Sequence, residues 1–192
     1  MKEKKKEMNP RRLKIIAAPV LAALLVISGC WNPFSPDEIG EGEEFQYHNP
    51  CDSAYKVLEN LEFAYKSLDI DQYMNCFRDD FEFHLLEVDW ADYTGNGVID
   101  EYWGIDLEEA YTENMFSNVS SIELSFSGDQ QSPWTGDSTG QSLQLIRGFD
   151  LKVYTNSSQT TGFMASGDAL FICRPDSTGE WYIWQWWDQS NT

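Results

Sequence analysis

The sequence predicts an α+β domain in which about three N-terminal helices pack on one face of an antiparallel sheet. Apolar residues recur at helical spacing in the first half of the domain, whereas they alternate with other residues in the second half. Helices followed by strands that are joined through hairpin-like loops are typical of α+β domains. Aromatic residues make up 15% of the chain, so we expect a packed core despite the acidic composition.

The helical half of the domain opens with a clear start signal, because Asp52 or Ser53 can serve as the N-cap of a first helix. Apolar residues follow at helical spacing as far as Leu68. Asp69 or Asp71 can cap a shorter second helix, and a third has an uneven amphipathic stripe. The spacing predicts helices over 52–68, 69–77 and 105–116.

Five segments have the alternation of a β-strand. In the fourth of them large and small residues alternate around Gly167, a pattern that suits a curved sheet. Polar, Gly-rich segments between the last four strands are predicted to be loops. The predicted strands cover 81–86, 121–126, 143–153, 163–173 and 181–187, and the loops cover 128–140, 155–162 and 174–179.

The first 29 residues have the layout of a secretory signal. A basic start precedes an apolar run over 15–27, which is too short to span a bilayer comfortably. The segment Ile27-Ser28-Gly29-Cys30 resembles the lipobox of bacterial lipoproteins, and this resemblance implies cleavage before Cys30 and lipidation of its thiol. An ordinary signal peptide and a transmembrane anchor are the alternatives. The expected location is the bacterial cell envelope, at the outer membrane where the cell has one.

Residues 30–50 are predicted to form an acidic, flexible tether, because they lack periodicity and are rich in Pro, Gly and Glu. Without residues 1–29 the chain keeps 6 basic and 30 acidic residues, which gives a formal charge of −24. Such a surface repels phosphate backbones and argues against nucleic acid as a partner. It also repels anionic lipid, so we expect membrane contact through the N-terminal lipid alone.

Three cysteines remain after Cys30, namely Cys51, Cys76 and Cys173. An odd number in an oxidising compartment is compatible with one disulfide and one buried thiol. A bond between Cys51 and Cys76 would join the first two helices, but the sequence leaves the pairing open. The spacing of the cysteines and of the two histidines does not suggest a zinc site.

Three segments resemble domains of the nuclear-transport-factor-2-like superfamily. Residues 58–73 resemble its long helix and the short helix that follows, 76–83 resemble the strand with an aromatic–x–aromatic pair, and 181–188 resemble the final strand. The resemblance covers about residues 52–188, so we place the domain at 51–189. It implies a cone, in which a strongly bent sheet wraps around the helices and leaves a cavity at the open end. Known members include isomerases, cyclases, dehydratases and non-catalytic binding or dimerising modules.

The last strand supplies most of the candidate site residues. Alternation places Trp184, Trp186 and Asp188 on one face. If this face lines the cone, Trp184 and Trp186 form a pocket together with Tyr65, and Asp188 at the rim is a candidate catalytic carboxylate. The competing interpretation is that Asp188 pairs with Arg174 or caps the end of the strand.

His84 is the second candidate for catalysis. It shares a face of its strand with Glu82, so the two side chains could form a polar pair in a pocket. They could equally lie on a solvated outer face beside an apolar core. The Asp base and the Tyr/Asp oxyanion hole of ketosteroid isomerases have no recognisable counterpart in the sequence.

One loop resembles the calcium-binding loops of EF-hands and dockerins. Asp92, Thr94, Asn96 and Asp100 place oxygen-bearing side chains at loop positions one, three, five and nine, as a calcium site requires. Position twelve is Trp103, where those families have a bidentate carboxylate. A plain Asn-Gly turn is therefore the alternative. No cofactor other than calcium is indicated.

These observations favour a lipid-anchored domain, without chemistry of its own, that binds a small apolar ligand or a partner protein in or around the cone. A homodimer is compatible with this hypothesis. The rival is an isomerase- or cyclase-like enzyme that uses Asp188 or His84 in the cavity. A third hypothesis, a calcium-stabilised envelope module, depends on the loop at 92–100 alone.

Overall fold

The computed structural model describes residues 46–137 and 140–190. The predicted signal peptide over 1–29, the predicted lipidation site Cys30 and the predicted tether up to residue 45 lie outside these described residues. Within them, no helix combines the length and the apolar character that crossing a bilayer requires.

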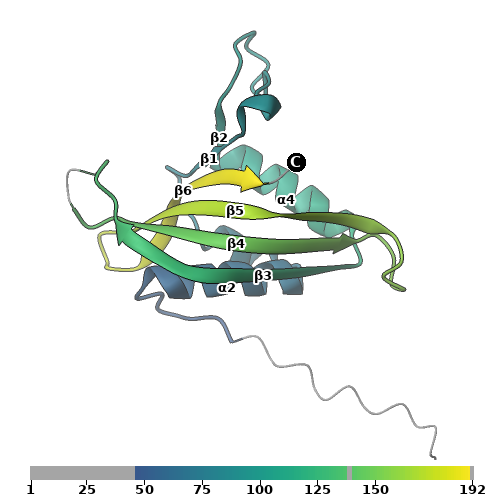
Figure 1. Cartoon of the computed structure of the whole chain (residues 1–192), viewed down its shortest axis with the longest axis horizontal. Coiled ribbons are helices and arrows are strands. Elements are labelled where there is room, and N and C mark those ends of the chain that lie inside the picture. Colours follow the sequence, from purple (N-terminus) through teal and green to yellow (C-terminus); the bar gives the residue numbers. More distant parts are fainter. Residues whose placement is uncertain (1–45, 138–139, 191–192) are drawn as a thin grey trace, which may run out of the picture. The chain divides into compact units, whose positions relative to one another are not determined.

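The described part of the chain is built on a six-stranded sheet with the order β2-β1-β6-β5-β4-β3 (Figure 1). Neighbouring strands are antiparallel except for β1 and β6, which run parallel. The sheet is therefore mixed and not wholly antiparallel as predicted. The strands β1 and β6 come from distant parts of the chain, so no hairpin sets their relative direction. The strands are β1 (Glu82–His84), β2 (Tyr102–Gly104), β3 (Ser121–Pro133), β4 (Leu143–Tyr154), β5 (Gly162–Pro175) and β6 (Trp181–Ser190).

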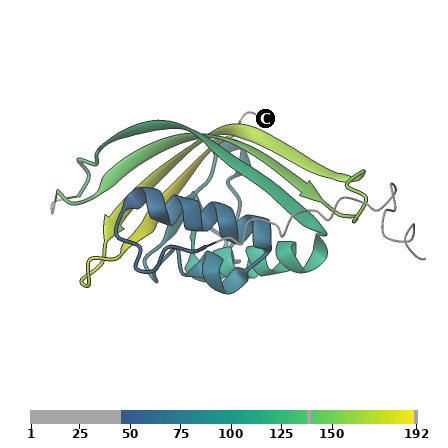
Figure 2. The same ribbon diagram turned by 90° about the horizontal axis from the view of Figure 1, so that it is seen from below.

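The sheet arches over the helices, as Figure 2 shows. The helices of the described residues are α2 (Ala54–Ser67), α3 (Ile70–Met74) and α4 (Ile105–Asn118). The strongly bent sheet with helices on its concave side confirms the predicted α+β cone. Its core includes fully buried side chains from both layers: Val57, Leu61, Tyr73, Phe81, Leu145, Phe171 and Ile183.

The structure resolves the alternative helix caps. Ser53 is the N-cap of α2, because its side chain accepts a hydrogen bond from the Lys56 amide. The helix ends at Leu68, whose φ of 56° lies in the left-handed region. Asp69 then caps α3 by accepting a hydrogen bond of 3.0 Å from the Gln72 amide.

Residues 46–50, which we assigned to the tether, lie against α2. The Tyr47 hydroxyl is 2.7 Å from the Ser67 hydroxyl. The Asn60 side chain accepts a hydrogen bond from the His48 amide and donates one to the His48 carbonyl. These contacts extend the domain toward the N-terminus as far as Tyr47, four residues before the predicted start at 51.

The predicted loop over 128–140 is wrong for its first part, because β3 continues to Pro133. The pairing of β3 with β4 shifts register between Ser127 and Gln130 and then resumes. Gly128 has a φ of 81° at this bulge, a conformation that glycine adopts without strain. The bulge accommodates one extra residue of β3, so a polar, Gly-containing segment remains part of the strand.

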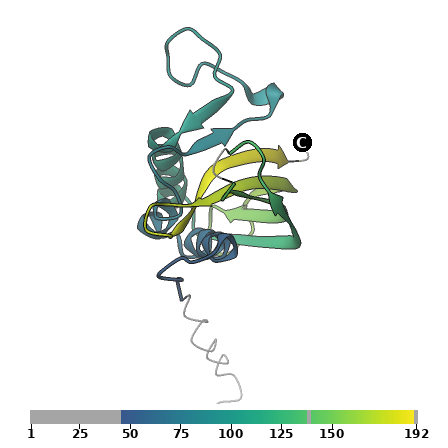
Figure 3. The ribbon, with the colours of Figure 1, turned by 90° about the vertical axis from the view of Figure 1, so that its left-hand side faces the viewer.

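An arm made of β1, β2 and the segment between them projects from the domain (Figure 3). The short strand β2 was not predicted. It pairs with β1 so that Trp103 lies opposite Phe83, and their rings stack with centroids 4.6 Å apart. This stacking joins the two strands of the arm, and Phe83 also contacts Trp186 of β6, with centroids 5.2 Å apart.

The three cysteines of the described residues are free thiols. Cys76 and Cys173 are buried in the core, and Cys51 is half-buried. Burial raises the pKa of the Cys51 thiol to about 11, so this group is protonated at neutral pH. The disulfide between Cys51 and Cys76 that the sequence left open is therefore not formed in this structure.

Candidate functional site in the cone

A mainly apolar cavity of about 200 Å³ lies between α2 and the bent sheet. Tyr65 and Leu124 are buried at its inner end, whereas Ala165 is exposed and marks its mouth. The described residues that line the cavity come from α2 and from five strands: Tyr65, Phe83, Leu124, Phe126, Phe149, Leu151, Ala165, Trp186 and Asp188. The sheet is thus bent around a hollow, as the cone prediction expected.

Small side chains on β5 leave room for this hollow. Ala165, Gly167 and Ala169 alternate with outward residues and share one face of the strand. Ala165 lies opposite Leu151 of β4, and Gly167 lies opposite Phe149. The alternation of large and small residues that the sequence shows in this segment therefore creates the space above β5.

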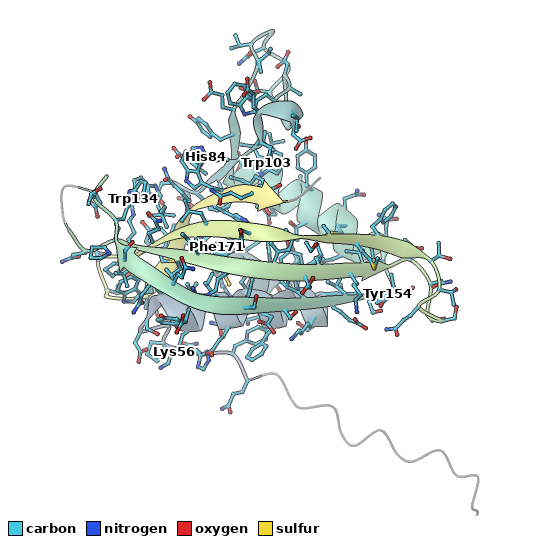
Figure 4. The ribbon with its side chains drawn as sticks, viewed as in Figure 1. Lys56, His84, Trp103, Trp134, Tyr154 and Phe171 are labelled. Carbon is cyan, nitrogen blue, oxygen red and sulfur yellow. The ribbon has the colours of Figure 1, made fainter. Side chains whose placement is uncertain are left out.

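Aromatic rings form a continuous wall beside the cavity. The centroid of the Trp186 ring is 5.2 Å from that of Phe83 and 5.0 Å from that of Phe171. Phe171 in turn contacts Phe126, with centroids 5.6 Å apart and rings nearly perpendicular. Figure 4 labels Phe171 at the middle of the sheet and Trp103 toward the end where β1 and β2 lie. Packing of this kind fixes the rings that a ligand would touch.

A bulge in β6 decides which of its residues face the cavity. The pairing of β5 with β6 shifts between Ile172 and Cys173, and Trp184 is the residue of β6 that has no partner in the register. Such an insertion reverses the alternation along a strand. Trp186 and Asp188 consequently line the cavity together with Tyr65, as predicted.

Trp184 does not line the cavity, so its predicted place in the pocket is wrong. Its ring lies under the guanidinium of Arg174, 4.0 Å from ring centroid to Cζ. The same Arg174 donates a hydrogen bond to the Tyr182 hydroxyl and forms an ion pair with Asp80. In the strand register Arg174 lies opposite Tyr182, whereas Asp188 lies opposite Ala169, five residues away along β5, so the predicted pair of Asp188 with Arg174 is not formed.

His84 lies on the outer face of the sheet, opposite to the cavity, because its neighbour Phe83 points inward. Its ring stacks on Trp187 with centroids 3.7 Å apart, and its Nε2 is 3.1 Å from Glu82 Oε2. Burial lowers the pKa of the His84 imidazole, while the neighbouring carboxylate opposes this effect. The predicted Glu82–His84 pair exists, but it cannot act on a ligand in the cone.

Glu108 is a buried carboxylate that the sequence interpretation did not single out. It is 5% exposed and accepts hydrogen bonds from the Tyr73 hydroxyl, from Trp103 Nε1 at 2.6 Å and from the Thr112 hydroxyl at 3.3 Å. Burial raises the pKa of the Glu108 carboxyl against the opposing effect of these hydrogen bonds.

This buried cluster lies behind the inner end of the cavity, since the Tyr73 ring packs at 5.2 Å against the ring of Tyr65. One feature of the sequence indicates this cluster around Glu108. Glu108, Thr112 and Phe116 are spaced by four residues and form the buried stripe of α4, so a carboxylate occupies a core-facing position.

In the loop at 92–100, side-chain oxygens accept hydrogen bonds from backbone amides of the same loop. The Asp92 carboxylate accepts hydrogen bonds from the amides of Asn96 and Gly97, and the Asp100 carboxylate accepts two from the amides of Tyr93 and Thr94. Among the described residues, no three His, Cys, Asp or Glu side chains gather in a group that could hold a metal ion. The structure therefore agrees with the Asx-type turn and adds no support for calcium.

Two other hollows lie among the described residues, with volumes of about 350 and 290 Å³. Both are lined mostly by polar and charged side chains. Their arginines are already engaged, because Arg174 pairs with Asp80, and Arg78 lies 3.0 Å from Asp176. Of these three hollows among the described residues, the cavity in the cone has the apolar lining suited to a small molecule.

No protein-family model matches the chain, and no curated protein matches its sequence. Solved structures do match it. A conserved protein from Planctomyces limnophilus is similar over 71% of this chain and 92% of its own, with a TM-score of 0.55 and 18% identity. An NTF2-like protein of unknown function from Pseudomonas putida matches over 74% and 87%, with a TM-score of 0.50 and 12% identity.

A hexachlorocyclohexane dehydrochlorinase matches over 71% of this chain and 81% of its own, with a TM-score of 0.51 and 7% identity. At these identities the likeness concerns the fold alone. The domain has the nuclear-transport-factor-2-like fold, as its three sequence segments predicted. Proteins of this fold include an enzyme and proteins of unknown function, so function has to be argued from the cavity itself.

Proposed function

We propose that this domain binds a small, mainly apolar molecule in the cone, at the cell envelope. The observation that carries the proposal is the cavity of about 200 Å³ between α2 and the sheet, with an aromatic and aliphatic lining. Ligand pockets in proteins are typically concave, mostly apolar and supplied with a few polar groups that fix orientation. In this cavity the Asp188 carboxylate is such a polar group.

The volume sets the size of the ligand. An engineered apolar cavity of about 150 Å³ in another protein takes up benzene. A cavity of about 200 Å³ is therefore large enough for a single ring with a short substituent. It is smaller than the range of about 300–1,000 Å³ that drug-sized ligands occupy, so a polycyclic substrate does not fit without movement of the walls.

The proposed place of action follows from the N-terminal sequence. Cleavage before Cys30 and lipidation of its thiol would hold the domain at a bilayer, since several acyl chains together anchor a protein stably. The acidic segment up to residue 45 would separate the domain from the lipid surface. A cavity held near a membrane in this way can capture apolar molecules as they enter or leave the envelope.

Filling the mouth of the cavity tests the proposal. We expect Ala165→Phe to weaken ethylbenzene binding at least about tenfold, because the new ring occupies the entrance, and to leave the fold intact because position 165 is exposed. Isothermal titration calorimetry measures the affinity, and the melting temperature reports on folding. Ser166→Phe is the matched control, since Ser166 is exposed on the opposite face of the same strand.

Two results would count against binding in the cone. One is that neither ethylbenzene nor benzylamine, an amine of nearly the same shape, binds the wild-type domain. The other is that Ala165→Phe and Ser166→Phe bind ethylbenzene as tightly as the wild type, which would place the binding site elsewhere.

An isomerase- or cyclase-like enzyme is the second candidate, and the position of Asp188 favours it. A carboxylate in an apolar cavity can act as a general base toward a bound ligand. His84 cannot contribute, because it lies on the outer face of the sheet. This hypothesis differs from simple binding in requiring that the ligand be converted.

A further inference from the structure

The described lining of the cone combines many aromatic rings with a carboxylate. Asp188 is the lining residue that carries a formal charge, and it lies two residues after Trp186 on the same face of β6. Opposite Asp188 across the sheet is Ala169, a small residue that is fully buried. Asp188 therefore has an aromatic neighbour along its own strand and a small neighbour on the adjoining strand.

Aromatic faces attract cations. The electron-rich face of an indole or phenyl ring stabilises an ammonium group placed within about 6 Å of the ring centroid, and cages of several rings recognise organic ammonium ligands. Phe83, Phe126, Phe149 and Trp186 all line the cavity that Asp188 enters. A carboxylate within such a set of rings matches a ligand that has an apolar ring and a cationic amine.

The charge of the whole domain acts in the same direction. The chain after residue 29 carries a formal charge of −24, so the potential around the cone attracts cations and repels anions. An anionic ligand would have to approach this surface and then lie against the Asp188 carboxylate. The negative potential of the domain and the Asp188 carboxylate both repel an anion, and both attract the ammonium group of an amine.

We propose that the ligand of the cone is a small organic amine, with its ammonium group at Asp188 and its ring against Trp186, Phe83 and Phe149. This inference rests on the proposed function and names the chemical class of the ligand. The ammonium would form a charge-assisted hydrogen bond with the carboxylate, while the ring would replace water along the apolar wall.

Benzylamine and ethylbenzene test the inference, because they have nearly the same shape and differ in charge. Calorimetry at pH 7 is expected to show benzylamine binding at least about tenfold more tightly than ethylbenzene to the wild-type domain. Asp188→Asn should abolish that preference by weakening benzylamine alone. Asp150→Asn is the matched control, since Asp150 is exposed on the opposite face of the sheet and its replacement changes the net charge equally.

The possible failures are distinguishable. Equal affinity of the two probes for the wild type, or an equal effect of Asp188→Asn and Asp150→Asn on benzylamine, overturns the amine inference and leaves the apolar cavity as proposed. If neither benzylamine nor ethylbenzene binds the wild type, the proposed function and this inference are overturned together.

Discussion

Replacing Glu108 with alanine is expected to lower the free energy of unfolding by about 3 kcal/mol, because it removes the acceptor of the Tyr73, Trp103 and Thr112 donors. The Tyr73 hydroxyl and Trp103 Nε1 both donate to this carboxylate, and the Tyr73 side chain has no exposed surface. Each unsatisfied buried group costs about 1–3 kcal/mol. Urea unfolding followed by tryptophan fluorescence measures the loss.

Glutamine at position 108 provides the control, since its amide oxygen can still accept hydrogen bonds but cannot ionise. In the wild type, the pKa of Glu108 is raised in the folded state above the ordinary value of 4.5. As the pH rises through 4.5, the unfolded chain ionises at this position before the folded chain does, so the contribution of Glu108 to stability falls until the folded pKa is passed.

We therefore expect the stability of the wild type relative to Glu108→Gln to fall as the pH rises above 4.5. A difference between the two proteins that stays constant with pH would show that burial does not raise the pKa of Glu108. A loss below about 1 kcal/mol in Glu108→Ala would show that the Tyr73 and Trp103 donors find other acceptors.

Replacing Phe171 with alanine is expected to cost about 3–5 kcal/mol, the largest effect that we predict for a single side chain. Phe171 has no exposed surface and contacts both Trp186 and Phe126, so its removal opens a void directly behind the wall of the cavity. The loss combines lost burial of the ring with an unfilled cavity. Urea unfolding measures the stability.

Phe171→Leu keeps much of the volume and should cost less, about 1.5 kcal/mol. If the alanine and leucine variants were equally stable, Trp186 and Phe126 would have to collapse into the space, and the aromatic wall would not be the rigid surface that we describe.

Much of the fold follows from local patterns in the sequence. Ser53 and Asp69 cap helices because their side chains reach the amide three residues ahead, and the sequence had narrowed each cap to two candidate residues. The alternation over 143–153 and 163–173 predicted the strands β4 and β5, because side chains along a strand alternate with a period of two. The apolar stripe of α2 likewise predicted its buried face, which includes Val57 and Leu61.

The remaining features depend on contacts between distant segments. The bulge at Trp184 arises from the register between β5 and β6, so strand alternation alone placed this residue on the wrong face. The parallel pairing of β1 with β6 likewise has no local signal. Glu108 is buried because Tyr73 and Trp103 come from other elements to satisfy it, and neither contact is visible in the spacing of α4 alone.

The most direct test of the central claim is a crystal of the domain soaked with bromobenzene and measured at the bromine absorption edge. An engineered cavity of comparable size takes up benzene, so a ring of this size has room in the cone. We predict a single anomalous peak between Tyr65, Phe149 and Trp186. Bromobenzene bound only at other places, or a cone that stays without it at saturating concentration, would contradict a ligand-binding cavity.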